Sequence, residues 1–305
     1  MFALIFSACW RTAGFFTAGF LRPALRSGRL VRQSGWLALA LLAALPQRAA
    51  WADLMVSPTR LVFEKNQRAA QLDLINNGTE TATYRIGIVN RRMSETGEFL
   101  PADSPAPGEQ FADELLRYSP RQVVLAPGAG QVVRVMLRKP ADLAPGEYRS
   151  HLIFEKVAAP KPDASLDAQA APPDGQVSVQ LTMLTGLSIP VIVRHGETAA
   201  TVTLTDLALS KPAPGQATLL AAVLQRSGNR SVYGDLTATF TPQGGTAQEA
   251  GKAGGVAVYT PNAQRRVKLQ LKPDLALTHG TLRLTFRERA ESGGKLLAEA
   301  AIELP

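Results

Sequence analysis

Cysteine is almost absent from this sequence: its 305 residues include a single one, Cys9. Cys9 lies in an N-terminal stretch with the character of a leader, so the chain that follows it contains no thiol. Without a thiol, that chain has no thiolate nucleophile, no disulfide and no cysteine-ligated zinc. Its fold must depend on a hydrophobic core alone, and a chain of about 250 residues is long enough to form one.

Groups that commonly carry catalysis are also scarce. The three histidines, His151, His195 and His279, are far apart and show no HxxxH or HxH spacing. There is no GxSxG motif, no Walker loop and no GxGxxG between a strand and a helix. Paired acids assembled in space stay open as a possibility, because sequence does not reveal them. We therefore expect a binding protein rather than an enzyme, with no cofactor and no metal.

Acidic residues are missing from residues 1–52, which hold six arginines. The apolar run WLALALLAAL, residues 36–45, follows five of these arginines and precedes AAWA, residues 49–52. A basic start, a short apolar run and a small-residue end are typical of a secretory signal peptide, and the run is too short to span a membrane comfortably. We expect residues 1–52 to be a signal peptide that is cleaved after Ala52.

Removal of this leader nearly balances the charge. The whole chain has 33 basic and 25 acidic residues, a net charge of +8, whereas the chain without the six leader arginines has 27 and 25, a net charge of +2. Nucleic-acid binding needs a concentrated basic stripe with aromatic platforms, and the sequence shows neither. We expect no nucleic-acid partner.

After residue 52 the sequence alternates between apolar and polar residues in short segments separated by Gly, Pro and Asn turns. The pattern predicts strands over residues 54–64, 70–76, 83–93, 121–126, 131–139, 148–157 and 176–194. A second series is predicted over residues 201–210, 217–226, 233–242, 255–260, 265–272, 281–290 and 296–304. Residues 108–120 are expected to be a short helical turn or an irregular connection. The series predicts an all-β protein of two immunoglobulin-like sandwiches, residues 53–195 and 196–305.

The predicted strand at residues 176–194 is the longest in the chain. A Pro/Ala/Asp-rich segment, residues 158–175, precedes it and is expected to form a flexible loop. Gly186 and Pro190 interrupt the strand, as is typical of a bulged edge strand. One of its faces carries Val177, Val179, Leu181 and Met183. These residues either face the core of their own sandwich or present an apolar edge to a partner strand.

Arg60 places a full charge on an otherwise apolar face of the first predicted strand. An arginine there can protect an exposed sheet edge while its charged end stays in water. It can also capture an anionic group of a partner, because a partly buried guanidinium binds a carboxylate through charge-assisted hydrogen bonds. Both interpretations stay open from the residues alone.

Five segments together resemble the PapD-like family of periplasmic pilus chaperones. They are SPTRLVFE (57–64), YRIGIVNRR (84–92), VVLAPGAGQVVRVMLRKP (123–140), GEYRSHLIFEKV (146–157) and IPVIVR (189–194). The resemblance covers residues 53 to about 195, and its details are similar to the archaic or alternative branch, which makes Csu-type fimbriae or secreted spore-coat-like proteins. It implies two immunoglobulin-like domains set at an angle, with a cleft between them. It further implies a periplasmic protein that binds pilus, fimbrial or related secreted subunits by donor-strand complementation and delivers them to an outer-membrane usher.

The same resemblance implies roles for particular residues. Arg60 corresponds to the cleft arginine that anchors the C-terminal carboxylate of a subunit, and the donor strand corresponds to Val177, Val179, Leu181 and Met183. The family's second cleft base, a lysine, corresponds to a position near Ser188 or Pro190, neither of which is basic. The alternatives are Arg92, Arg194 or another base, or Arg60 acts alone. Arg194 also corresponds to the base of an inter-domain salt bridge, whose acidic partner is not clear because Arg149 stands at its position with Glu147 nearby.

Two other functional classes stay open from the sequence. A structural or adhesive surface protein could also have two β-sandwich domains, but a pilus subunit is expected to carry an N-terminal donor extension. The first predicted strand begins almost at the expected cleavage site and leaves no room for that extension. A periplasmic enzyme or solute-binding protein would need a pocket with convergent polar groups, which sequence does not show.

Overall fold

The computed structural model describes residues 54–158, 186–210 and 217–305. Its regular structure is almost entirely β-strand, with the short 3-10 helices η1 (Asp113–Leu115) and η3 (Ala290–Ser292) in connections. The expected signal peptide, residues 1–52, and nearly all of the expected loop at 158–175 lie outside the described residues. The described residues belong to one compact unit that runs from Trp51 to Pro305.

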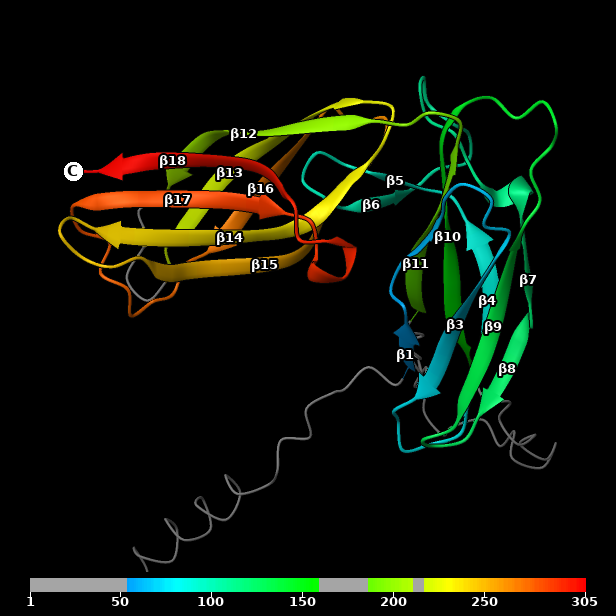
Figure 1. Cartoon of the computed structure of the whole chain (residues 1–305). Helices are drawn as coiled ribbons and strands as arrows, with labels where there is room; N and C mark the ends of the chain where they lie inside the picture. The colour runs from blue at the N-terminus through cyan, green and yellow to red at the C-terminus, as the bar shows by residue number, and fades with distance from the viewer. Residues whose placement is uncertain (1–53, 159–185, 211–216) are drawn as a thin grey trace, which may run out of the picture. The chain divides into compact units, whose positions relative to one another are not determined.

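The first sandwich packs a four-stranded sheet against a five-stranded sheet (Figure 1). The four-stranded sheet has the order β1 (Leu54–Ser57), β3 (Ala69–Asn76), β9 (Gly130–Leu137), β7 (Leu116–Ser119). The five-stranded sheet has the order β2 (Leu61–Phe63), β11 (Gly186–His195), β10 (Gly146–Val157), β4 (Ala82–Val89), β8 (Gln122–Leu125). Apolar side chains from both sheets fill the core between them, including the buried Phe63, Leu74, Phe154 and Val191.

The second sandwich has its own core. Its three-stranded sheet has the order β12 (Ala200–Leu209), β13 (Leu219–Gly228), β16 (Gln264–Gln270). Its four-stranded sheet has the order β15 (Gln248–Val258), β14 (Val232–Pro242), β17 (Gly280–Arg287), β18 (Leu296–Leu304). Leu220, Phe240, Leu284 and Phe286 are fully buried between these sheets. The two cores and four sheets confirm the predicted all-β fold of two sandwiches.

The first predicted strand is in fact two strands that lie in different sheets. β1 pairs antiparallel with β3, whereas β2 pairs in parallel with β11. Pro58 follows β1, and proline cannot donate a backbone hydrogen bond to a sheet ladder. Because the chain crosses to the facing sheet, the buried positions change from even-numbered residues such as Val56 to odd-numbered residues such as Leu61. Arg60 therefore lies in the crossing segment and not on a strand face.

One further prediction of local structure was wrong, and another was incomplete. Residues 83–93 do not form one strand: β4 ends at Val89, and β5 (Arg91–Met93) pairs with β6 (Phe99–Pro101) in a separate hairpin. Residues 91–101 are called the β5–β6 hairpin below. Residues 108–120 contain not only η1 but also β7, which pairs with β9. The chain turns at Asn90, whose side chain donates to Asp113 Oδ2 at 3.1 Å and accepts from Ser150 Oγ at 2.6 Å.

Candidate binding site between the two sandwiches

Arg60 reaches from the first sandwich to two tyrosines of the second. Its guanidinium carbon lies 4.4 Å from the ring centroid of Tyr233 and 5.5 Å from that of Tyr259. Its Nη1 donates a long hydrogen bond of 3.4 Å to Tyr259 Oη. Within the described ranges no carboxylate pairs with it, so most of its donors are available to a ligand. Stacking on aromatic faces holds the guanidinium in place without neutralising its charge.

Tyr259 has a second arginine on its ring. The guanidinium carbon of Arg149, on β10, lies 4.4 Å from the Tyr259 ring centroid. Burial raises the pKa of Tyr259, and the charges of Arg60 and Arg149 oppose that rise. A phenol in such a site stays neutral at physiological pH, so Tyr259 acts as a donor, an acceptor and an aromatic surface. Two cations from different parts of the first sandwich thus contact this ring.

Arg149 is buried, with 4% of its surface exposed. Its Nη2 lies 3.6 Å from Glu109 Oε1 and donates to the carbonyl of Arg91 at 3.2 Å. Its Nε and Nη1 have no hydrogen-bond partner among the residues that the structure describes. Burial lowers the pKa of Arg149, and Tyr259 and Glu109 oppose this effect. The positive charge of Arg149 adds to that of Arg60 around Tyr259.

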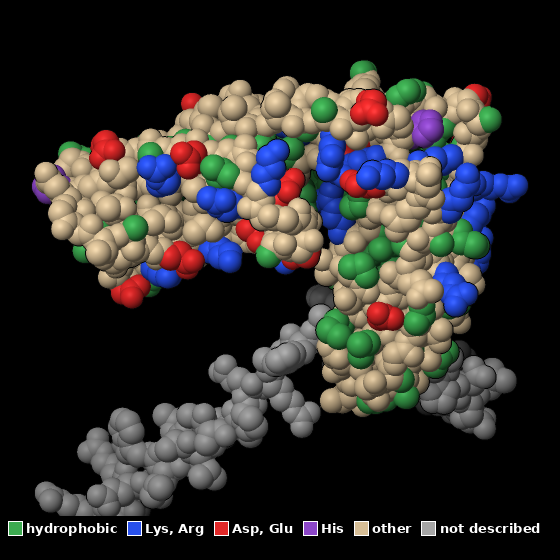
Figure 2. Space-filling model, viewed as in Figure 1, with side chains coloured by type: hydrophobic (Ala, Val, Ile, Leu, Met, Phe, Trp, Pro, Cys, Tyr) green, Lys and Arg blue, Asp and Glu red, His purple; other side chains and the backbone are tan. Residues whose placement is uncertain are grey.

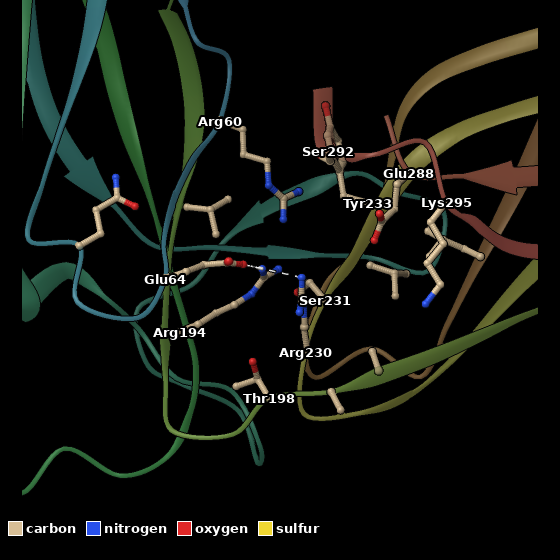
Figure 3. Close-up of a pocket in the computed structure, with 16 residues that line it drawn as sticks. Arg60, Glu64, Arg194, Thr198, Arg230, Ser231, Tyr233, Glu288, Ser292 and Lys295 are labelled. Atoms are coloured by element: carbon tan, nitrogen blue, oxygen red, sulfur yellow. Dashed lines mark hydrogen bonds and ion pairs between the residues drawn. The ribbon is translucent and has the colours of Figure 1, made fainter. Parts of the chain in front are cut away.

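A cavity of about 690 Å³ opens beside Arg60 (Figure 3). Basic side chains in its lining are Arg60, Arg194, Arg230 and Lys295, and acidic ones are Glu64 and Glu288. Figure 2 shows Lys and Arg side chains gathered where the two sandwiches meet. Since the cavity has more basic than acidic groups, its chemistry favours an anionic ligand. In Figure 3 Arg60 comes from the first sandwich, whereas Lys295 comes from the second.

A buried carboxylate joins the two sandwiches through Arg194 and Ser231, which both line this cavity. Glu147 Oε2 accepts hydrogen bonds from Arg194 Nε at 3.0 Å and from the backbone N–H of Ser231 at 3.1 Å. Glu147 Oε1 accepts a bond from Ser231 Oγ. The side chain of Glu147 is fully buried, and the guanidinium of Arg194 also binds Glu64. Because Ser231 immediately precedes β14, this group of contacts ties β10 and β11 to the second sandwich.

The predicted site residues have different surroundings. Arg60 and Arg194 both line the cavity, but Arg194 is bound by two glutamates. Arg92 binds Glu109 Oε2 at 2.6 Å and is not part of the cavity lining. The four donor-strand residues, Val177, Val179, Leu181 and Met183, lie outside the described residues.

Sequence reasoning missed the second-sandwich half of the site. Tyr233, Tyr259, Arg230 and Lys295 belong to segments without a recognisable motif, and only the fold brings them to Arg60. The sequence left the acidic partner of Arg194 unclear, with Glu147 nearby, and in the structure Glu147 binds Arg194. Glu147 and Arg194 are paired across β10 and β11, and the register of these strands cannot be read from the sequence.

β11 has an edge that is only partly covered. Along its whole length it pairs with β10, but β2 pairs only with Val191–Val193 on its other side. Among the described strands, none pairs with that side of residues 186–190. Leu187, at the start of this free edge, is 37% exposed although it has the same parity as the buried Ile189. An unpaired edge with exposed apolar side chains is suited to strand addition.

No cluster of three or more His, Cys, Asp or Glu side chains suited to a metal occurs within residues 54–158, 186–210 and 217–305. Over the same described ranges, the structure contains no helix that is both long and apolar enough to cross a membrane.

Comparisons with known proteins find similarity at the level of structure. No protein-family model matches the sequence, and no curated protein matches it. Over 83% of this chain and 100% of the other, it is similar to the YadV chaperone, with 11% identity and a TM-score of 0.43. A chain from the complex of the SafA pilin with the SafB chaperone of Salmonella enterica has 12% identity and a TM-score of 0.40, covering 84% of this chain and 98% of that one. A chain from the CsuC–CsuE chaperone–tip adhesion subunit complex of Acinetobacter baumannii has 14% identity and a TM-score of 0.38, covering 83% and 98%.

Proposed function

We propose that this protein is a periplasmic chaperone for fimbrial, pilus or related secreted subunits. It binds a subunit by adding a strand to the free edge of β11 and by holding the C-terminal carboxylate of that subunit at Arg60. It then delivers the subunit to an outer-membrane usher. Binding of this kind uses backbone hydrogen bonds and side-chain insertion, so it needs no catalytic group, cofactor or metal. The predicted signal peptide and the absence of cysteine after it suit a protein exported to the periplasm.

The register around β11 is the observation that carries this proposal. Arg60 immediately precedes Leu61, where β2 begins its parallel pairing with β11 at Val191. The free edge of β11, residues 186–190, therefore ends beside Arg60. A partner strand that runs parallel to β11 along this edge has its C-terminus directed toward Arg60. One edge and one cation thus specify both the direction and the end point of the bound strand.

The proposed donor residues precede β11 in the sequence. Val177, Val179, Leu181 and Met183 have the same odd-numbered parity as the exposed Leu187. Continued as an unbroken strand, β11 would present all five apolar side chains on one face. The proposal assigns these side chains to the groove of a subunit that lacks a strand.

Lys295 is the proposed second base of the carboxylate anchor. It lines the same cavity as Arg60, and no carboxylate pairs with it among the described residues. Arg92 and Arg194 are less suited because each already binds a glutamate. On this proposal, Lys295 of the second sandwich takes the place of the base that is absent near Ser188 and Pro190.

Co-expression with a fimbrial subunit tests the proposal. We expect the subunit to accumulate in the periplasm only when this protein is present, and to co-purify with it. Equal accumulation of the subunit without this protein would contradict a chaperone function. The rival hypothesis of a structural or adhesive protein predicts instead that this protein itself appears at the cell surface.

Arg60→Ala is expected to weaken binding of a subunit or of its C-terminal peptide about tenfold to a hundredfold. The reason is the loss of hydrogen bonds to a charged group, each typically worth ~1.5–3 kcal/mol. The matched control is Arg121→Ala, because Arg121 also stacks on a tyrosine, with 5.4 Å between its guanidinium carbon and the ring centroid of Tyr118. Titration calorimetry with the free-acid and the C-terminally amidated peptide measures both effects. Equal affinity of the parent for acid and amide would show that no carboxylate is captured.

A further inference from the structure

The β5–β6 hairpin is bound firmly to the first sandwich at its base. Arg92 on β5 donates from Nε and Nη2 to Glu109 Oε2 at 3.0 and 2.6 Å, and from Nη2 to the carbonyl of Ser104 at 3.0 Å. Arg149 on β10 donates to the carbonyl of Arg91 at 3.2 Å. The side chains of Glu109 and Arg149 are 2% and 4% exposed, so this base is a buried ionic attachment.

The tip of the hairpin is a tight and well-bonded turn. The backbone N–H of Ser94 donates to Glu98 O at 2.8 Å, and that of Gly97 donates to Ser94 O at 3.0 Å. Ser94 Oγ accepts from the N–H of Glu98 at 3.1 Å and lies 2.8 Å from Thr96 Oγ1. Gly97 has a φ of +94°, a value that residues with a Cβ rarely adopt. The tip therefore has a defined shape to present to a neighbour.

This tip binds the second sandwich at and just before β16 (Figure 1). The backbone carbonyl of Glu95 accepts from the backbone N–H of Arg266 at 2.7 Å. The Glu95 carboxylate accepts from Gln264 Nε2 at 2.8 Å and lies 3.2 Å from Arg266 Nη2. Asn262 Nδ2 donates to the carbonyl of Met93 at 2.7 Å. Four polar contacts thus join the β5–β6 hairpin, through Met93 and Glu95, to residues 262–266 of the second sandwich.

Gly97 adds a close packing contact. A Cβ at this position would lie only 2.4 Å from Nη2 and 2.7 Å from Cζ of Arg265, so the guanidinium packs directly against the glycine. The same guanidinium donates from Nη1 to the carbonyl of Ala257 at 2.7 Å. Ala257 lies two residues before Tyr259, so Arg265 links the hairpin to the segment that carries this ring.

Apolar residues of the hairpin complete the connection. Met93 is 3% exposed and packs in a cluster with Ile192 of β11 and with Ala257 and Tyr259 of the second sandwich. The ring centroid of Phe99 lies 6.0 Å from that of Tyr259. The ring that contacts Arg60 is thus bounded by the hairpin on another side.

From these contacts we infer that the β5–β6 hairpin is a strap that fixes the second sandwich against the first and positions Tyr259 and Tyr233 around Arg60. Glu95, Gly97 and Asn262 are positioning residues in this device: none lines the cavity, and they act through the placement of the tyrosines. The structural part of the inference is independent of the proposed function. Only its effect on subunit binding rests on that function.

Distance measurements between two spin labels test the strap in the free protein. Cysteines introduced at Val124, which is 64% exposed on the first sandwich, and at Thr203, which is exposed on the second, accept the labels. Cys9→Ser removes the only native thiol. Electron–electron double resonance then reports the distribution of distances between the sandwiches.

We expect Glu95→Arg and Asn262→Ala each to broaden this distribution at least twofold. Glu95→Arg places a cation against Arg266, and Asn262→Ala removes the bond to Met93. The matched control is Glu249→Ala, because Glu249 forms an ion pair of similar length, 3.3 Å, and similar exposure, 49%, inside the second sandwich. The control should leave the distribution unchanged.

Unchanged distributions in both strap variants would overturn the inference. Circular dichroism and the thermal midpoint identify a variant that has unfolded. If Glu95→Arg has unfolded, the distance distribution of the milder Asn262→Ala tests the inference. In the binding assay we expect both variants to lose about threefold to tenfold in affinity while Arg60 is intact. Broadened distances with full affinity would uphold the strap but contradict its coupling to the proposed binding site.

Discussion

Replacing Glu147 with alanine is expected to lower the free energy of unfolding by about 3 to 5 kcal/mol, the usual cost of breaking a buried ion pair from one side. The Glu147 side chain is completely buried and accepts bonds from Arg194 and from both the N–H and the hydroxyl of Ser231. Removing it leaves Arg194 Nε and both Ser231 donors without the acceptor that Glu147 supplies. An isolated buried donor costs more than the bond itself contributes.

Urea unfolding with two probes measures this effect. Because Glu147 connects the two sandwiches, we also expect a single unfolding transition to separate into two. The control is Glu64→Ala: Glu64 binds the same Arg194, but its side chain is 47% exposed, so its loss should cost under about 1 kcal/mol. Equal, small losses in the two variants would show that the Glu147 contacts do not hold the sandwiches together.

Acid is expected to destabilise this protein through His151. Its imidazole is 1% exposed, and neither ring nitrogen has a hydrogen-bond partner among the described residues. Burial, as the largest cause, and the charges of Arg149 and Arg91 together lower its pKa from the ordinary value of 6.5 to about 3. Phe99 packs against the imidazole in a T-shaped arrangement, with 5.0 Å between the two ring centroids.

The sign of the effect follows from which state binds the proton first. In the unfolded chain His151 protonates as the pH falls through about 6.5, whereas in the folded protein it stays neutral until about pH 3. The unfolded state binds more protons across this window, so stability is complete above pH 6.5 and falls as the pH is lowered toward 3. The loss should reach about 2 to 3 kcal/mol by about pH 4.5.

His151→Leu isolates this contribution, because leucine does not titrate and leaves no polar atom in the buried site. We expect the stability of the variant to fall less steeply between pH 6.5 and 4.5 than that of the parent, when both are measured by urea unfolding. His279→Leu, at an exposed position, should retain the steeper dependence of the parent since His151 is still present. Parallel pH profiles for the parent and His151→Leu would contradict the assignment.

The alternation of apolar and polar residues predicts most strands, because a strand with one buried face has an apolar residue at every second position. It fails where the burial changes side within a segment, as between Val56 and Leu61, where the chain crosses from one sheet to the other. Pro58 was the available signal for that break, since proline interrupts a sheet ladder. The β5–β6 hairpin was missed because Asn90 turns the chain within a segment whose pattern alone suggests one strand.

The site was predictable only from one side. Arg60 is conspicuous as a charge among apolar residues, but its neighbours Tyr233 and Tyr259 are 173 and 199 positions away and lie in the other sandwich. Nothing local to a tyrosine distinguishes a ring that stacks on a guanidinium from one that packs in a core. The same limit applies to Glu147 and Ser231, which are 84 positions apart and meet only after both sandwiches have formed.

The shortness of β2 has a consequence for the kinds of partner that fit. β2 covers only Val191–Val193 of β11, so the free edge at residues 186–190 ends beside Arg60. When Arg60 holds the C-terminal carboxylate of a partner strand, each residue of that strand has a fixed position along the edge. At about 3.3 Å per residue, residues 186–190 offer roughly 17 Å of edge. On the proposed binding mode, one additional C-terminal residue would turn every side chain of the partner to the opposite face, whereas two would restore the original face. The protein would then select partners whose apolar residues lie at the correct odd or even positions, counted from the C-terminus.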